Sequence, residues 1–312
     1  MDQTFFSVVI PVFNREELVS KVLTSVINQT FKDFEIIVVD NCSTDRTVEK
    51  VRSFLIENNK IKIICNSENL ERCISRNIGI QSSSGQYVCF LDSDDFWLEN
   101  HLLDMFDFIS KKDTKGLYFS NAYNSDNFSS LTDRICPLLN DFELFDYLLT
   151  YTFNPSRVAV HHTILKEFDF DPKIPGLEDF DLWLRIATKY PIIQLDKRTV
   201  IYNIHEDSTT ATELRKSDRE IRLYKTVFEK KIFDGILPIN SKNRLMSMCY
   251  YRRVLSLNSS FNPGIIQYYI LKAFFLYPKG YNENTNRTMA FIFVNQLPII
   301  GLLFKKCRSL FK

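Results

Sequence analysis

Residues 87–95 read Tyr-Val-Cys-Phe-Leu-Asp-Ser-Asp-Asp, a short apolar run that leads directly into four polar residues, three of them acids. The apolar run has the length expected of a strand that is buried on both faces. Three similar runs precede it, at Phe6–Val12, Glu35–Asp40 and Lys60–Cys65. Between the runs, apolar residues recur at helical spacing, for example at Ile74 and Ile78. This alternation predicts an α/β fold, with a mostly parallel sheet covered by helices on both faces.

Polar residues gather where these strands end. Asn14 follows the first strand, Asp40 ends the second, and Asp92–Asp95 follow the fourth. Ligands of parallel sheets bind beyond the carboxyl ends of the strands, and carboxylate oxygens suit Mg²⁺ or Mn²⁺. The alternative for the acids is that Asp94 or Asp95 caps a helix that begins near Phe96.

The other candidates also allow two interpretations each. Asp40 can accept a hydrogen bond from a base or a ribose hydroxyl, or it can stabilise a turn. Asn14 and Glu17 have the spacing of a capping box. Arg72 and Arg76 lie one helical turn apart, where they can complement a diphosphate or remain solvated charges.

The second half of the chain has a looser pattern. Glu178 and Asp179 fall in the first turn of a predicted helix, whose apolar face includes Trp183. Acids are favoured there by the helix dipole, but such an acid can also take a proton from an attacking hydroxyl. His205 ends a predicted strand that starts near Thr199. Its imidazole can bind a metal or have a structural role.

Composition excludes several classes of protein. The chain has 312 residues, 45% hydrophobic and 25% charged, enough for one large core or two unequal ones. A net charge of +1 is not that of a nucleic-acid-binding protein. The eight glycines form neither a dinucleotide-binding loop nor a P-loop. Seven cysteines without a CxxC pair indicate reduced thiols in a cytoplasmic setting.

Six motifs in order resemble a family 2 glycosyltransferase of the inverting GT-A type. They lie at residues 9–14, 38–45, 69–79, 90–95, 178–185 and 202–208, so the resemblance covers roughly residues 5–210. It implies nucleotide-sugar contacts from Pro11, Phe13, Asn14, Asp40, Arg76, Asp92 and Ser93. It also implies metal ligation by Asp94 and His205, and catalysis by Asp179 and Glu178.

Three residues depart from the family pattern. Asn41 stands where a second aspartate is frequent, and Cys42 stands where glycine is frequent. Glu71 replaces the glycine that often precedes the arginine, which adds an acid near the phosphate site. That acid favours Arg76 over Arg72 as the nucleotide contact.

The resemblance implies transfer of a sugar from a nucleoside-diphosphate sugar, expected to be UDP-linked, to a hydroxyl of a glycan or lipid-linked glycan in cell-surface polysaccharide biosynthesis. Asp179 would act as general base and Mn²⁺ or Mg²⁺ would assist. One alternative is a sugar-phosphate nucleotidyltransferase, although the Gly-rich phosphate loop expected of that class is missing after the first strand. Another is an inactive nucleotide-sugar-binding module, which the intact acidic motifs disfavour.

The predicted domains are a catalytic domain over residues 1–211 and a helical region over residues 212–312. The catalytic domain divides into a nucleotide-sugar half, about residues 1–120, and an acceptor half, about residues 121–211. No run of eighteen clean apolar residues predicts a membrane span. Residues 289–312, apolar and then basic, predict either peripheral contact with the inner face of the cell membrane or a helix packed on the catalytic domain.

Overall fold

The computed structural model of the chain describes residues 4–57, 59–126, 130–133, 137–204, 218–256 and 263–277. The chain divides into two compact units, Met1–Glu206 and Asp207–Lys312. The predicted domain boundary at residue 211 falls outside the described residues and stays a prediction.

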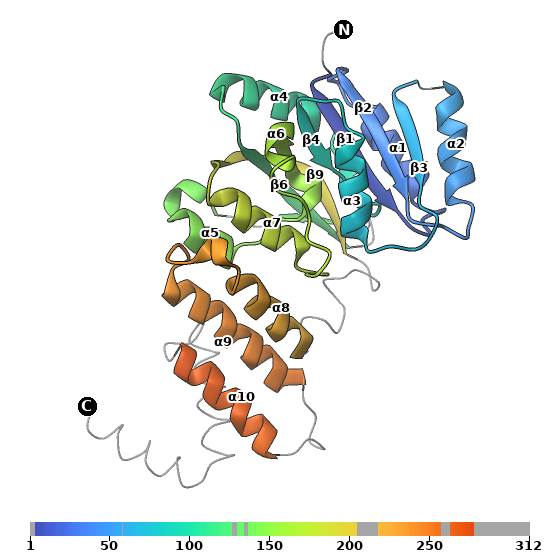
Figure 1. The fold of residues 1–312 in the computed structure, drawn as a ribbon. Coiled ribbons are helices and arrows are strands. Elements are labelled where there is room, and N and C mark those ends of the chain that lie inside the picture. Colours follow the sequence, from blue (N-terminus) through green and yellow to red (C-terminus); the bar gives the residue numbers. More distant parts are fainter. Residues whose placement is uncertain are drawn as a thin grey trace, which may run out of the picture. The chain divides into compact units, whose positions relative to one another are not determined.

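The described part of the first unit is built on a nine-stranded sheet (Figure 1). Its strands are β1 (Phe6–Val12), β2 (Phe34–Asp40), β3 (Ile61–Cys65), β4 (Tyr87–Phe90), β5 (Phe96–Trp97), β6 (Leu117–Asp126), β7 (Leu131–Asp133), β8 (Val158–His161) and β9 (Ile192–Ile204). They lie in the order β3-β2-β1-β4-β8-β6-β9-β5, and β7 pairs with β6. Strands β3, β2, β1 and β4 are parallel, as is the pair β6 and β9, whereas β8 and β5 run antiparallel to their neighbours. The predicted parallel sheet is therefore confirmed in the first half of this unit, and the second half is mixed.

Helices cover both faces of this sheet, as predicted. They are α1 (Val19–Ile27), α2 (Thr47–Glu57), α3 (Arg72–Gln81), α4 (His101–Lys112), α5 (Leu144–Thr150), α6 (His162–Leu165) and α7 (Glu178–Ala187). Val8 and Ile10 of β1 share a buried cluster with apolar residues of α1, α2 and α4. On the opposite face of β1, Val9 meets Gly79 of α3. Successive strand residues point to opposite faces, so β1 and β2, which are buried at every residue, need both layers.

No apolar alternation marks β6 in the sequence, because Ser120, Asn121 and Ser125 lie within it. All three are buried in the structure. The guanidinium of the fully buried Arg157 donates to the backbone oxygen of Ser120 (2.6 Å) and to Oδ1 of Asn121 (3.2 Å). Hydrogen bonding of this kind lets a polar strand run through the interior.

One local prediction and one of the alternatives are wrong. Helix α1 begins at Val19, behind Leu18, without a side-chain cap, so Asn14 and Glu17 form no capping box. Instead, Oδ1 of Asn14 accepts a hydrogen bond from the backbone N–H of Thr44 (2.9 Å). Phe96 starts the short strand β5, and the next helix begins only at His101, so neither Asp94 nor Asp95 caps a helix near Phe96.

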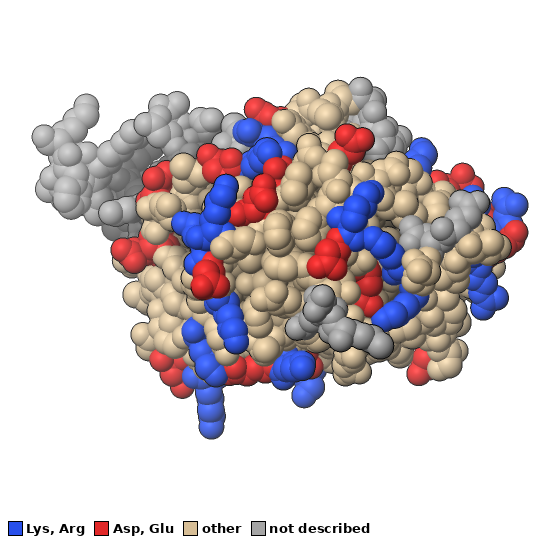
Figure 2. Space-filling model, turned by 90° about the horizontal axis from the view of Figure 1, so that it is seen from above, with Lys and Arg blue, Asp and Glu red and all other residues tan. Residues whose placement is uncertain are grey.

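The described part of the second unit is helical, as predicted. It contains α8 (Asp218–Phe228), α9 (Ile239–Ser256) and α10 (Pro263–Leu276). Within the described residues, no helix has the length and apolar character that crossing a bilayer requires. The predicted membrane-contacting residues 289–312 fall outside the described residues. On the face of the chain in Figure 2, basic and acidic side chains are interspersed, in keeping with the net charge of +1.

Candidate active site

The candidate site lies beyond the carboxyl ends of β1, β2 and β4. Val12 and Asp40 are register partners at the ends of β1 and β2, and the acidic loop, residues Asp92–Asp95, follows β4 on the other side of β1. The parallel register therefore brings Asp40 and Asp92 to the same edge of the sheet, as the sequence predicts.

Asp40 presents an unused acceptor in the interior. Its side chain is 2% exposed, and Oδ2 accepts a hydrogen bond from the backbone N–H of Ser43 (3.1 Å). Oδ1 is buried and has no hydrogen-bond partner among the described residues. Buried polar atoms are normally paired, so this oxygen is suited to an N–H or O–H of a ligand.

The turns after β1 and β2 are joined to each other. Asn14 (φ 49°) and Cys42 (φ 65°) are both left-handed, a conformation that asparagine tolerates and cysteine rarely adopts. Cys42 therefore occupies a position that favours glycine, which gives a physical reason for the glycine of the family pattern. The backbone N–H of Asn14 donates to Oγ of Ser43 (2.9 Å), so the second turn supports the first. Pro11 is buried in β1, whereas Phe13 is 38% exposed.

Asn41 supports the chain that leads to α3. Its Oδ1 accepts from the backbone N–H of Leu70 (2.8 Å), and its Nδ2 donates to Oδ1 of Asn69 (2.8 Å). The amide thus holds a loop through a donor and an acceptor, which a carboxylate could not do.

The acidic residues after β4 divide into accessible and buried ones. Asp92, Ser93 and Asp94 are partly exposed, whereas Asp95 is 1% exposed. Asp95 accepts hydrogen bonds from Nδ2 of Asn154 (2.7 Å), Oγ of Ser156 (2.6 Å) and the backbone N–H of Asn203 (3.2 Å). Burial, and then the charges of Asp94 and Asp92, raise the pKa of Asp95. Asp95 thus ties the acidic loop to its surroundings.

Arg76 joins the acidic loop to α7. Its Nη2 lies 2.6 Å from Oδ1 of Asp92, and its Nη1 lies 3.1 Å from Oε1 of Glu178. Arg72 contacts the same oxygen of Glu178 through Nε (2.8 Å). Burial opposes ionisation of Glu178, but the charges of Arg72 and Arg76 outweigh it, and the pKa of Glu178 is lowered. Oε2 of Glu178 accepts from the backbone N–H of Gly176 (2.6 Å), which fixes the turn before α7.

Asp179 follows in the first turn of α7 and is partly exposed. Burial, and then the charge of Glu178, raise its pKa to about 6. Its Oδ1 accepts a hydrogen bond from the backbone N–H of Phe180 (2.7 Å). A carboxylate with this pKa is mostly ionised at neutral pH and is a stronger base than an ordinary aspartate.

Of the two predicted metal ligands, only Asp94 lies among the described residues. Among the described residues, no three His, Cys, Asp or Glu side chains gather closely enough to hold a metal ion by themselves. Asp94 is partly exposed beside Asp92, and His205 directly follows β9 but lies outside the described residues.

Several residues of the site carry no signal in the sequence. Asn154 and Ser156 hold Asp95, and Phe170 lies against Arg76, with Cζ 5.3 Å from the ring centroid. All three come from residues 121–175, which contain no recognisable motif. Contacts between distant residues place them at the site, so no local pattern could identify them.

The family model for glycosyl transferase family 2 matches residues 7–166. The chain belongs to this family. It is 30% identical to the uncharacterized glycosyltransferase MJ1057 of Methanocaldococcus jannaschii over 69% of this chain and 76% of that protein. It is 26% identical to the UDP-Glc:alpha-D-GlcNAc-diphosphoundecaprenol beta-1,3-glucosyltransferase WfgD of Escherichia coli, over 70% of this chain and 85% of that protein.

The fold of this glycosyltransferase is also that of solved structures. S. aureus TarS 1–349 in complex with UDP-GlcNAc matches with a TM-score of 0.66 at 20% identity, over 86% of this chain and 81% of the TarS chain. This likeness confirms the GT-A fold class, and the family model and the relatives confirm that the chain is a glycosyltransferase.

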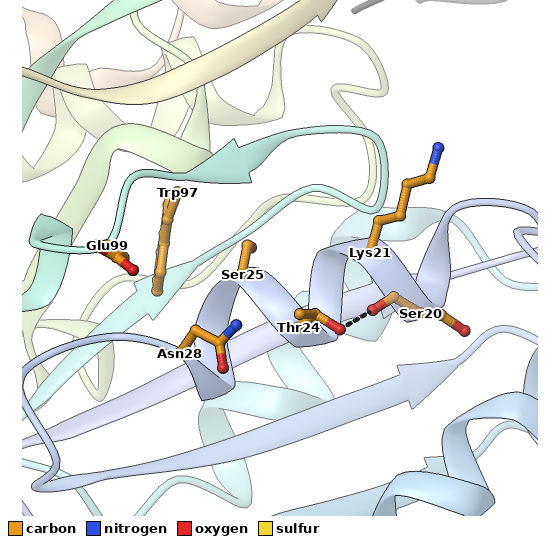
Figure 3. A pocket seen from close by; sticks show the side chains of 7 residues that line it. All are labelled: Ser20, Lys21, Thr24, Ser25, Asn28, Trp97 and Glu99. Carbon is orange, nitrogen blue, oxygen red and sulfur yellow. Dashed lines mark hydrogen bonds between the residues drawn. The ribbon is translucent and has the colours of Figure 1, made fainter.

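A separate groove of about 410 Å³ lies between α1 and β5 of this glycosyltransferase (Figure 3). It is lined by Ser20, Lys21, Thr24, Ser25, Asn28, Trp97 and Glu99. None of the predicted site residues lines it, so the groove is distinct from the carboxylate cluster.

Proposed function

We propose that the enzyme transfers a sugar from a UDP-sugar to a hydroxyl of a glycan or lipid-linked glycan acceptor, with inversion, in cell-surface polysaccharide biosynthesis. The similarity to WfgD, whose name specifies UDP-Glc and a diphosphoundecaprenol-linked sugar, supports this choice of donor and acceptor class. So does the fold shared with TarS, whose structure contains UDP-GlcNAc.

The observation that carries the proposal is the pair of contacts by which Arg76 joins Asp92 of the acidic loop to Glu178, directly before the partly exposed Asp179. Burial and the charge of Glu178, which raise the pKa of Asp179 to about 6, support the role of a base. Asp179 accepts the proton of the acceptor hydroxyl while the hydroxyl oxygen bonds to the anomeric carbon. The bond from that carbon to the diphosphate breaks, and its electron pair leaves with UDP. A single displacement from the opposite face inverts the configuration of the sugar.

Asp40 is proposed to bind the nucleotide. Its buried Oδ1, without a partner among the described residues, suits the N–H of a uracil ring. Pro11, Phe13, Asn14 and Ser93 remain proposed contacts because they surround the same strand ends.

A divalent cation, Mn²⁺ or Mg²⁺, fits the residues present. Asp92 and Asp94 offer hard oxygen donors on partly exposed side chains, and such cations often take only one or two carboxylates from the protein. Asp94 and His205 would hold the cation, which would stabilise the charge that develops on the departing diphosphate. Asp92 would face the nucleotide.

Calorimetry with UDP, with and without Mn²⁺, followed by turnover of a panel of UDP-sugars tests the proposal. We expect UDP binding that strengthens at least about tenfold with Mn²⁺, and turnover of one UDP-sugar above the rest. Binding without any turnover would favour the inactive module. Family membership already decides against the sugar-phosphate nucleotidyltransferase.

A further inference from the structure

The guanidinium of Arg76 is enclosed by protein. The side chain is 2% exposed, and its two terminal nitrogens contact Asp92 and Glu178 at 2.6 and 3.1 Å. An arginine that binds a diphosphate has to offer N–H groups to the ligand. Arg76 directs both terminal nitrogens to carboxylates of the protein, and its Nε, which has no partner among the described residues, is enclosed with the rest of the side chain. Arg72, one turn earlier, is 43% exposed.

The surroundings of Arg76 hold it in this place. Its Cζ lies 5.3 Å from the ring centroid of Phe170. Asn77 holds Phe170 through two hydrogen bonds, from Nδ2 to the backbone oxygen (2.8 Å) and from the backbone N–H to Oδ1 (3.0 Å). Phe170 in turn packs against Phe90 and Trp183, with ring centroids 5.3 and 6.0 Å apart. Residues of β4, α3 and α7 thus determine where the guanidinium lies.

Arg76 lies between the two halves of the candidate site. It is 16 residues from Asp92 and 102 residues from Glu178 in the sequence. Asp92 belongs to the proposed donor side, and Glu178 directly precedes the proposed base. We propose that Arg76 is a positioning residue that fixes Asp92 relative to the Glu178–Asp179 turn and does not itself touch the diphosphate. The inference rests on the proposed function, because it assigns Asp179 the role of base.

Loss of Arg76 has a defined physical consequence. Asp92 and the buried Glu178 lose the cation between them, and burying a carboxylate without full compensation is unfavourable. The turn that carries Asp179 then moves relative to the donor. A displacement of about 1 Å at a reacting group can lower the rate about 100-fold, whereas a nucleotide bound elsewhere keeps its contacts. The rate should therefore fall more than the affinity for UDP.

The test uses the full chain with Arg76→Met, Arg76→Lys and, as a matched control, Arg252→Met. Arg252 of α9 also pairs with a buried carboxylate, that of Glu220 in α8 (2.8 Å), and both residues belong to the second unit, which contains none of the proposed site residues. We measure kcat with the UDP-sugar that the panel selects, and Kd for UDP with Mn²⁺ by calorimetry. We expect Arg76→Met to lower kcat at least about tenfold and to change Kd less than about tenfold.

Arg76→Lys keeps the charge but cannot span both carboxylates with a rigid fork, so we expect it to recover only part of kcat. If Arg76→Met does not fold, Arg76→Lys takes its place in the test. Arg252→Met should retain kcat within about threefold. A rise in Kd of about tenfold or more in the Arg76 variants would identify Arg76 as a diphosphate contact and overturn the inference. A kcat that falls less than about tenfold in Arg76→Met would also overturn it. Where only Arg76→Lys folds, a kcat within about twofold of the wild type would do so. Absence of turnover by the wild-type enzyme would instead refute the proposed function.

Discussion

At the scale of single residues, the pKa of Asp179 determines how the reaction should respond to pH. Burial and Glu178 raise this pKa to about 6. The base acts as the carboxylate, so the active form is lost as pH falls through about 6. We expect kcat to be nearly constant above about pH 7 and to fall about tenfold per unit below about pH 5.5. A rate that stays constant between about pH 5 and 8 would contradict this role of Asp179.

Residue types could be predicted at this scale more easily than their partners. Asp40, Asp92 and Asp179 follow from strand ends and motif order, and the structure places them beside the expected elements. Asp95 looks like its neighbours in sequence, yet it is buried because Ser156 and Asn203, far along the chain, donate to it. A local sequence pattern cannot predict hydrogen-bond partners that are so distant in the sequence.

At the scale of elements, α3 is held against β1 by a glycine. A Cβ at Gly79 would lie 2.3 Å from Cγ1 of Val9, far inside contact distance. Gly79→Ala must therefore move α3, which carries Arg76, away from the sheet. We expect it to lower the free energy of unfolding by about 1–3 kcal/mol, measured by denaturant unfolding.

Val9→Ala provides the control for this clash. Removing the two Val9 methyl groups makes room for the new Cβ, so the double variant should be less destabilised than the sum of the two single variants. We expect a coupling energy of about 1 kcal/mol. Additive effects would show that the contact between Gly79 and Val9 does not cause the destabilisation by Gly79→Ala.

The difference between β1 and β6 shows which elements the sequence can predict. β1 is buried along its whole length and consists mainly of β-branched and aromatic residues, so its pattern is unambiguous. Most of β6 is buried as well, and Arg157 and Thr199 hydrogen-bond to its polar residues Ser120 and Asn121 from other parts of the chain. Its strand character therefore depends on residues that are distant in sequence.

At the scale of the whole molecule, the fold follows from the alternation of strands and helices in residues 6–112. The family model covers the same part of the chain and extends to residue 166. The role of the second unit does not follow from such a pattern, since its described part consists of helices without a recognised motif.

We propose that residues 289–312 bring the enzyme to anionic membranes. Deleting them should abolish most sedimentation with vesicles that contain anionic lipid, while kcat on a soluble acceptor stays within about threefold, because apolar and basic side chains together provide interfacial affinity. Neutral vesicles serve as the control. Unchanged sedimentation after the deletion would assign this segment to packing on the protein.

The central claim, that Asp179 is the general base of sugar transfer, is tested most directly by Asp179→Asn, which keeps the shape of the side chain and removes its basicity. Transfer and UDP binding with Mn²⁺ are measured on the same preparation. The account predicts that the transfer rate falls at least about 100-fold while Kd for UDP changes less than about threefold. A transfer rate close to that of the wild type would contradict it.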